Sequence, residues 1–129
     1  MPITALYAGL LAPIFVVLAL RVIGLRRGAQ VAVGDGGDKV LLRRMRVHAN
    51  FAEYVPLALV LLVLAESLKT DPRILHALGI CLIIGRISHA YGMSQSKETF
   101  AFRVSGMALT FATLIGAALG CLIGSIGRI

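Results

Sequence analysis

Apolar residues along this chain fall into four long runs that are separated by short polar stretches. Each run is about as long as the 20 residues that a helix needs to cross a hydrocarbon core roughly 30 Å thick. We therefore predict four membrane-spanning helices, at approximately residues 3–25, 44–68, 73–94 and 101–127.

The polar stretches between the runs carry signals for turns and helix ends. Residues 26–43 form the longest, and its central sequence GDGGD at 34–38 is typical of a flexible loop. In the second connection, Asp71 is a predicted helix N-cap and Pro72 the first helical residue. Four spans joined in this way predict an all-α, integral membrane, up-down four-helix bundle, with residues 1–129 forming a single transmembrane domain.

Composition and charge agree with a membrane protein. Hydrophobic residues make up 58% of the 129 positions, and the mean hydropathy is +0.89. The net charge is +7, but aromatic residues do not alternate with the basic ones, so we expect no nucleic-acid partner. The basic residues gather at the first and third connections: Arg26, Arg27, Lys39, Arg43, Arg44, Lys97 and Arg103. This bias predicts that loops one and three are cytoplasmic and that both termini lie on the opposite side.

The last predicted helix contains small residues at every fourth position. They are Ala108, Ala112, Gly116, Gly120 and Gly124. Such a ladder lets another helix approach closely, so we predict a packing seam, either within one chain or between subunits.

The start of the second helix combines polar and apolar residues in a regular pattern. At 100° per residue, four polar side chains share an arc of about 80°; they are Arg43, Arg46, Asn50 and Glu53. His48 falls on a different face. Polar groups at membrane depth are costly and need partners or water. Arg43 and its neighbour Arg44 could extend to the lipid headgroups, and Arg46 and Glu53 could form an internal ion pair, or the stripe could line a binding site.

Other helices bring polar residues to the same level. With alternating helix directions, Arg86 and His89 near the end of the third helix lie beside the start of the second, as do Arg103 and the basic end of the first helix. The three histidines are scattered and no metal-binding motif is present, so we predict no metal site. A cationic pocket with one carboxylate suits a small zwitterionic ligand whose carboxylates meet arginine and whose ammonium meets Glu53.

Residues 46–56, RVHANFAEYVP, resemble the helix-two signature of the membrane-associated proteins in eicosanoid and glutathione metabolism, the MAPEG family. Residues 85–89, GRISH, are similar to the helix-three motif of that family, and Arg103 stands where the family has an arginine in helix four. The resemblance extends over nearly the whole chain.

This resemblance implies a homotrimer in membrane lipid that binds glutathione between neighbouring subunits near the cytoplasmic face. Carried over by position, Arg46, Asn50, Glu53 and Tyr54 would hold the tripeptide, with help from His89 and Arg26. His48 and Arg86 lie inside the same motifs and complete the predicted binding set. Arg103 would face the thiol and favour its thiolate form, which makes Arg103 the predicted catalytic residue.

The chain departs from the eicosanoid-forming members at two positions. Met93 stands where those members have tyrosine, and Val104 where the prostaglandin-forming type has serine. We therefore expect a general glutathione transferase or peroxidase that acts on lipophilic electrophiles or lipid hydroperoxides. Two alternatives remain open: a non-catalytic membrane scaffold that binds lipid or another ligand, and a small transporter.

Overall fold

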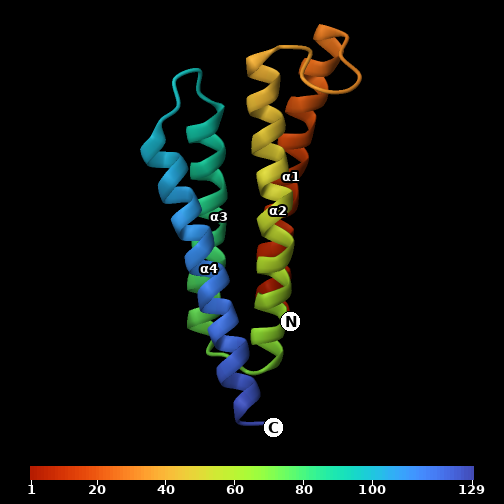
Figure 1. The fold of residues 1–129 in the computed structure, drawn as a ribbon. Helices are drawn as coiled ribbons and strands as arrows, with labels where there is room; N and C mark the ends of the chain where they lie inside the picture. The colour runs from red at the N-terminus through yellow and green to blue at the C-terminus, as the bar shows by residue number, and fades with distance from the viewer.

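The computed structural model describes residues 1–129 and contains four α-helices and no β-strand. The helices are α1 (Pro2–Ala29), α2 (Lys39–Ser67), α3 (Pro72–Ser94) and α4 (Phe100–Ile126). They run up and down, so that the α1–α2 and α3–α4 connections lie at one end of the bundle and both termini at the other (Figure 1). All four helices are long and apolar enough to cross a membrane, which confirms the predicted fold class.

The first loop is shorter than its sequence predicts. Helix α1 continues to Ala29 rather than ending near residue 25, and α2 begins at Lys39 rather than near residue 44. The Asp38 carboxylate accepts hydrogen bonds from the backbone N–H groups of Val40 and Leu41 at 2.8 and 3.2 Å, which caps α2. Such a cap is worth about 1 kcal/mol. It allows the basic start of α2 to be helical outside the apolar run.

The predicted start of the third helix is confirmed. The Asp71 side chain accepts a 2.7 Å hydrogen bond from the backbone N–H of Arg73, and Pro72 is the first residue of α3. Proline is tolerated there because its missing N–H would have no partner inside the helix.

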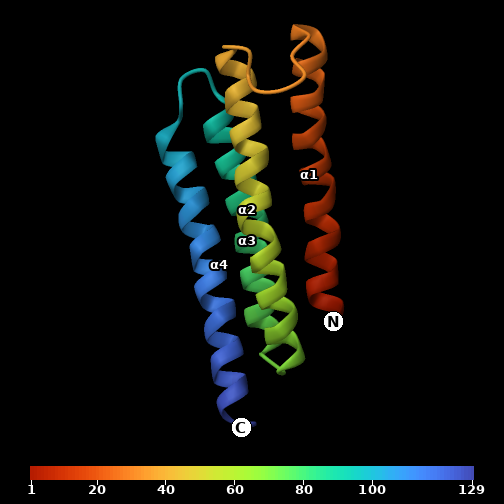
Figure 2. The same ribbon diagram turned by 45° about the vertical axis from the view of Figure 1, so that its right-hand side comes forward.

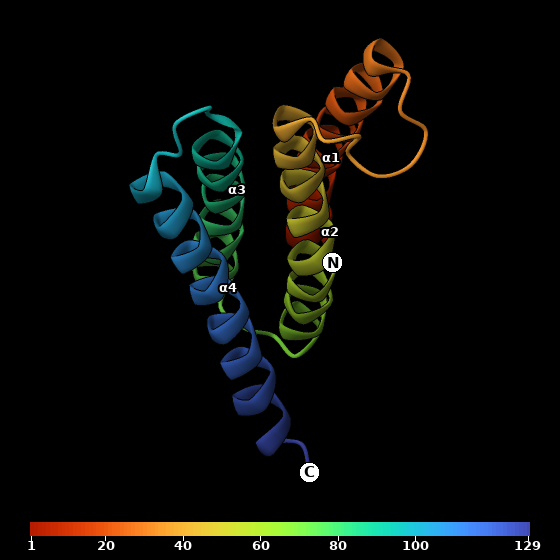
Figure 3. The same ribbon diagram turned by 45° about the horizontal axis from the view of Figure 1, so that its top comes forward.

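Helix α2 contacts all three other helices, whereas α1 and α4 do not touch one another. Figures 2 and 3 show α4 beside α3, on the side of the bundle away from α1. The α3–α4 crossing depends on Gly85 and Gly106. A Cβ atom on Gly106 would lie 2.6 Å from the carbonyl oxygen of Gly85 and 2.6 Å from the backbone nitrogen of His89. This close approach fixes the start of α4 against the end of α3.

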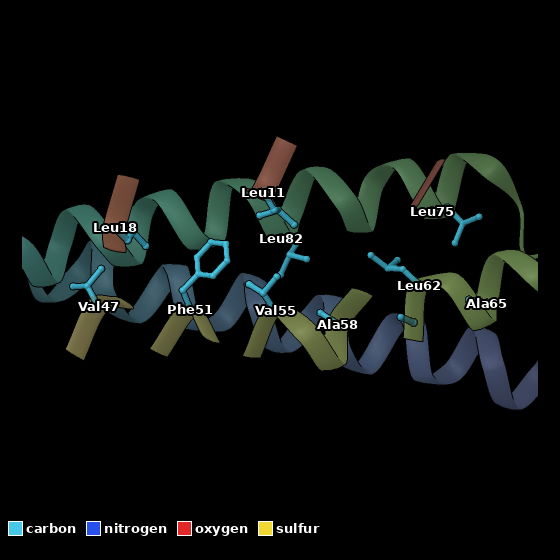
Figure 4. Packing of buried hydrophobic residues seen from close by; sticks show 11 residues of the cluster. Leu11, Leu18, Val47, Phe51, Val55, Ala58, Leu62, Ala65, Leu75 and Leu82 are labelled. Atoms are coloured by element: carbon cyan, nitrogen blue, oxygen red, sulfur yellow. The ribbon is translucent and has the colours of Figure 1, made fainter. Parts of the chain in front are cut away.

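The buried apolar core follows one face of α2 and is filled from α1 and α3, with Ala117 added by α4 (Figure 4). Its members are Leu11, Leu18, Val47, Phe51, Val55, Ala58, Leu62, Ala65, Leu75, Leu82 and Ala117. Only 22 of the 129 residues are buried. Most apolar side chains therefore point outward, as is expected where lipid or a neighbouring subunit covers a helix.

The predicted seam on α4 lies partly within the chain. Gly116 faces Leu78, and Gly124 faces Leu68 so closely that a Cβ atom there would come within 2.7 Å of the leucine side chain. Ala108 and Ala112, by contrast, are exposed. The glycine half of the ladder serves packing inside the subunit.

Polar residues at the opposite end of the bundle have structural partners. The Glu66 carboxylate accepts hydrogen bonds from the backbone N–H groups of Ile3 and Thr4, which caps the start of α1. The Tyr7 hydroxyl donates to the carbonyl oxygen of His76 and lies 2.9 Å from its Nδ1. These contacts tie α1 to α2 and α3.

Candidate functional site

A buried arginine lies at the centre of the candidate site. Arg86 on α3 is 2% exposed, and its Nη1 donates a 2.7 Å hydrogen bond to Oδ1 of Asn50 on α2. Its Nη2 lies 3.3 Å from the sulfur of Met107 on α4, and its guanidinium carbon lies 5.9 Å from the centre of the Tyr54 ring. A guanidinium over an aromatic face is attracted by the ring. The buried charge thus links three helices through partners that carry no negative charge.

This contact fixes the orientation of the Asn50 side chain. A guanidinium group only donates hydrogen bonds, so the Asn50 atom that faces Arg86 must be its oxygen. The amide nitrogen of Asn50 therefore points away from Arg86, with two N–H groups free to donate to an anionic ligand. The Nε atom of Arg86 is buried and has no partner. No carboxylate contacts this buried guanidinium, so its positive charge has no ionic partner within the chain.

Arg46 and Glu53 lie on an exposed side of α2. Their side chains approach to 3.8 Å between Nη1 and Oε1, and they are 52% and 51% exposed. The ion pair between Arg46 and Glu53 that the sequence allows is thus present, but its contact distance is long and both side chains are exposed. Exposed pairs of this kind contribute about 0–1 kcal/mol to stability, so both charges can turn to a ligand at little cost.

A second ion-pair group lies closer to the loops. Glu98, in the α3–α4 turn, accepts hydrogen bonds from Arg43 of α2 at 2.9 Å and from Arg103 of α4 at 3.0 Å. Glu98 is thus a carboxylate that the sequence did not place among the candidate site residues, and it pairs with two of the predicted arginines. Glu98 lies in an irregular turn, so helical periodicity does not predict where its side chain lies. Arg43 has a protein partner rather than lipid headgroups alone.

The two arginines change the acidity of Glu98. Partial desolvation raises the pKa of this carboxyl, but the charge of Arg103 and the hydrogen bonds from Arg103 and Arg43 outweigh it, so the pKa lies below its usual value. Glu98 is therefore ionised at neutral pH.

His89 is buried, at 3% exposure, where α3 crosses α4. Its backbone packs on Gly106, one turn after Arg103. Together with the bond from Arg86 to Asn50, this contact shows that α2, α3 and α4 meet at this end of the bundle. The predicted contribution of α1 through Arg26 is not found within the chain, because Arg26 binds loop carbonyls.

Two predicted residues lie elsewhere within the subunit. The His48 ring stacks on Phe15 of α1, with ring centres 4.7 Å apart, which agrees with its different face on the helix. Arg26 donates to the carbonyl oxygens of Ala32 and Gly34 in the first loop, at 3.3 and 2.8 Å. Neither side chain joins the group around Asn50 in the same chain.

Comparison with known proteins agrees with the motifs on α2, α3 and α4. The sequence model of the MAPEG family matches residues 4–123. The chain belongs to the MAPEG family. It is also 37% identical over 113 residues to proteins from Escherichia coli K12 and Escherichia coli O6:H1, each named inner membrane protein YecN. The match covers 88% of this chain and 85% of the relative. Together with four apolar helices, these similarities identify a multi-pass integral membrane protein of this family.

Proposed function

We propose that this MAPEG protein binds glutathione and acts as a glutathione transferase or peroxidase on lipophilic substrates. The observation that carries the proposal is the Asn50 carboxamide, which Arg86 holds with its N–H groups directed away from the buried guanidinium. The open charges of Arg46 and Glu53 flank it along the same helix.

The charges of glutathione match this arrangement. The tripeptide carries two carboxylates, one ammonium group and one thiol. Arg46 and the Asn50 amide suit a carboxylate, and Glu53 suits the ammonium group. Tyr54, next to Glu53, adds a hydroxyl group and an aromatic face. A ligand that brings both signs of charge would replace the long Arg46–Glu53 contact with two shorter ones.

Arg103 is the proposed catalytic group. A thiol of the cysteine type has a pKa of about 8.5, and a guanidinium beside it favours the thiolate, which is the nucleophile. In a transferase the thiolate attacks an electrophilic carbon, forms a carbon–sulfur bond and expels the leaving group. In a peroxidase it attacks the hydroperoxide oxygen and breaks the O–O bond, so that the substrate leaves as an alcohol and the sulfur becomes a sulfenic acid. A second glutathione then reduces the sulfenic acid, which forms glutathione disulfide and releases water. Lipophilic substrates would arrive from the bilayer along the apolar helix faces.

We further propose that the functional unit is a homotrimer with the ligand between subunits on the cytoplasmic side. Arg46 and Glu53 are half exposed on a helix that crosses the membrane, and charges that face lipid are costly. A neighbouring subunit would cover them. Its Arg26, which does not reach Asn50 of its own chain, would then be available to the shared site, whereas Nε2 of His48 is buried within its own chain.

One observation favours a second candidate, a non-catalytic ligand-binding scaffold. Arg103 pairs with Glu98 at 3.0 Å, so its charge is partly compensated within the chain. A transporter has less support, because Glu66 and His76 at the other end of the bundle are engaged in hydrogen bonds between helices.

Conjugation of chlorodinitrobenzene to glutathione tests the proposal. The full-length protein in nanodiscs should catalyse the reaction, and Arg103→Gln should lower kcat/KM at least about tenfold, which corresponds to 1.4 kcal/mol of transition-state stabilisation. Arg128→Gln, which removes the same charge at the opposite end, should leave the rate unchanged. A wild-type protein that binds glutathione without conjugating any electrophile or reducing a lipid hydroperoxide would favour the scaffold instead.

A further inference from the structure

Glu98 is the one carboxylate in contact with Arg103, the residue proposed to meet the thiolate. We propose that Glu98 is an internal counter-anion for Arg103. It pairs with Arg103 when no ligand is bound and is displaced by a ligand with an anionic sulfur. It pairs with Arg103 again once that sulfur is neutral. The inference rests on the proposed function and adds to it a residue that selects the charge state of the ligand.

The two oxygens of Glu98 have separate partners. Oε1 accepts from Nη1 of Arg43 on α2 at 2.9 Å, and Oε2 accepts from Nη1 of Arg103 on α4 at 3.0 Å. Glu98 can therefore release Arg103 while it stays bound to Arg43. Release costs one of two ion pairs and does not leave the carboxylate without a partner.

The backbone beside Glu98 is held against the end of α3. The N–H of Thr99 donates to the carbonyl oxygen of Gly92 at 3.3 Å. A Cβ atom on Gly92 would lie 2.9 Å from the carbonyl oxygen of Thr99 and 2.7 Å from the backbone nitrogen of Arg103. Since only glycine fits there, the residues on both sides of this contact keep a fixed spacing. Helix packing thus fixes the backbone from which the Glu98 side chain extends.

A carboxylate and a thiolate repel each other when both lie against one guanidinium group. The side chains of Glu98 and Arg103 are 28% and 40% exposed, so a ligand can reach the contact between them. An anionic sulfur competes with Glu98 for Arg103 and can take its place. A thioether carries no charge and cannot compete.

This difference gives Glu98 a role in turnover. When the thiolate attacks an electrophile, its negative charge leaves with the departing group and the product is a neutral thioether. Arg103 then loses its ligand partner, and Glu98, still bound to Arg43, pairs with it again. The contact thereby favours release of the product over release of glutathione.

Calorimetry with two glutathione derivatives tests the inference on the full-length protein in nanodiscs. Glutathione sulfonate carries a permanent negative charge at sulfur, and S-methylglutathione carries none. We expect Glu98→Gln to tighten the Kd for the sulfonate about tenfold and the Kd for S-methylglutathione less than about twofold. Asp35→Asn removes the same charge from the nearby first loop, where Asp35 has no ion-pair partner, and should change neither value. If Glu98→Gln lowers the Kd of both ligands equally, or raises the Kd of the sulfonate, the inference is overturned.

A ligand-free measurement separates this inference from the proposed function. Phenylglyoxal modifies arginines that are free of a carboxylate partner, and peptide mapping by mass spectrometry reads Arg103 individually. We expect Arg103 to react at least about threefold faster in Glu98→Gln than in the wild type or in Asp35→Asn. If no protein binds either ligand, the proposed function fails; if the rate at Arg103 does not change, the role of Glu98 fails whether or not glutathione binds.

Discussion

Arg86 on α3 donates a 2.7 Å hydrogen bond to the side-chain oxygen of Asn50 on α2, and both residues lie in the segment that the family model matches. The guanidinium is buried, and its other contacts are a methionine sulfur and an aromatic ring. The pair combines a structural link between helices with a hydrogen-bond donor that points outward. Substitutions at Asn50 can separate these two roles.

Asn50→Asp should keep the protein stable and weaken ligand binding. The carboxylate retains an acceptor for Arg86 and compensates its charge, so the melting temperature should match or exceed that of the wild type. It also removes the amide donor and repels a carboxylate, so glutathione affinity should fall at least about tenfold, or 1.4 kcal/mol. Asn50→Leu should instead lower the free energy of unfolding by about 1–3 kcal/mol, because Arg86 loses its acceptor. If Asn50→Asp binds glutathione like the wild type, the amide is not a ligand donor.

Glu53→Gln should remove recognition of the ligand ammonium group with little effect on stability. The pair with Arg46 is open and long, so the free energy of unfolding should change by less than about 1 kcal/mol. The wild type should bind glutathione more tightly than glutaryl-cysteinyl-glycine, which lacks the ammonium group, and Glu53→Gln should bind the two equally. If the variant still prefers glutathione to glutaryl-cysteinyl-glycine, another group binds the ammonium.

Gly106→Ala should disturb the crossing of α3 and α4. The added methyl would lie within 2.6 Å of the carbonyl of Gly85 and the backbone nitrogen of His89, and overpacking of this kind costs about 1–3 kcal/mol. Gly24→Ala on α1 is the matched control, because nothing lies within 4 Å of its added methyl. It should be neutral or stabilising by up to about 1 kcal/mol. Equal thermal unfolding of the two variants would show that the crossing can relax.

The ion pairs of Glu98 should make stability depend on pH in one direction. Its pKa in the folded protein lies below the usual value of about 4.3. The stabilisation is therefore complete above that value and is lost as the pH falls through the lower pKa of the folded state. The wild type should melt above Glu98→Gln at neutral pH, and the difference should shrink below about pH 4. A difference that grows in acid would contradict the assigned direction.

Much of the fold follows from the sequence for simple physical reasons. Apolar runs of membrane length locate the helices, and Asp71 followed by Pro72 marks a helix start. Alternating helix directions then place Asn50, Arg86 and Arg103 at the same end of the bundle. Helical angle also separates His48 from the stripe, and its stack on Phe15 agrees with that.

The remaining features depend on contacts that periodicity does not encode. The basic start of α2 is too polar for an apolar run, and its helical state depends on the Asp38 cap. Glu98 lies in a turn without a repeating geometry, so its two arginine partners emerge only from the packing of α2 against α4. The hydrogen bond from Arg86 to Asn50 likewise depends on the distance between α2 and α3, which periodicity does not give.

The most direct test of the glutathione-binding proposal is a titration of the full-length wild-type protein in nanodiscs with glutathione, followed by calorimetry and by the ultraviolet absorbance of the thiolate. We predict saturable heat together with a thiolate signal at neutral pH, and the loss of that signal in Arg103→Gln. The absence of saturable binding would contradict the proposal.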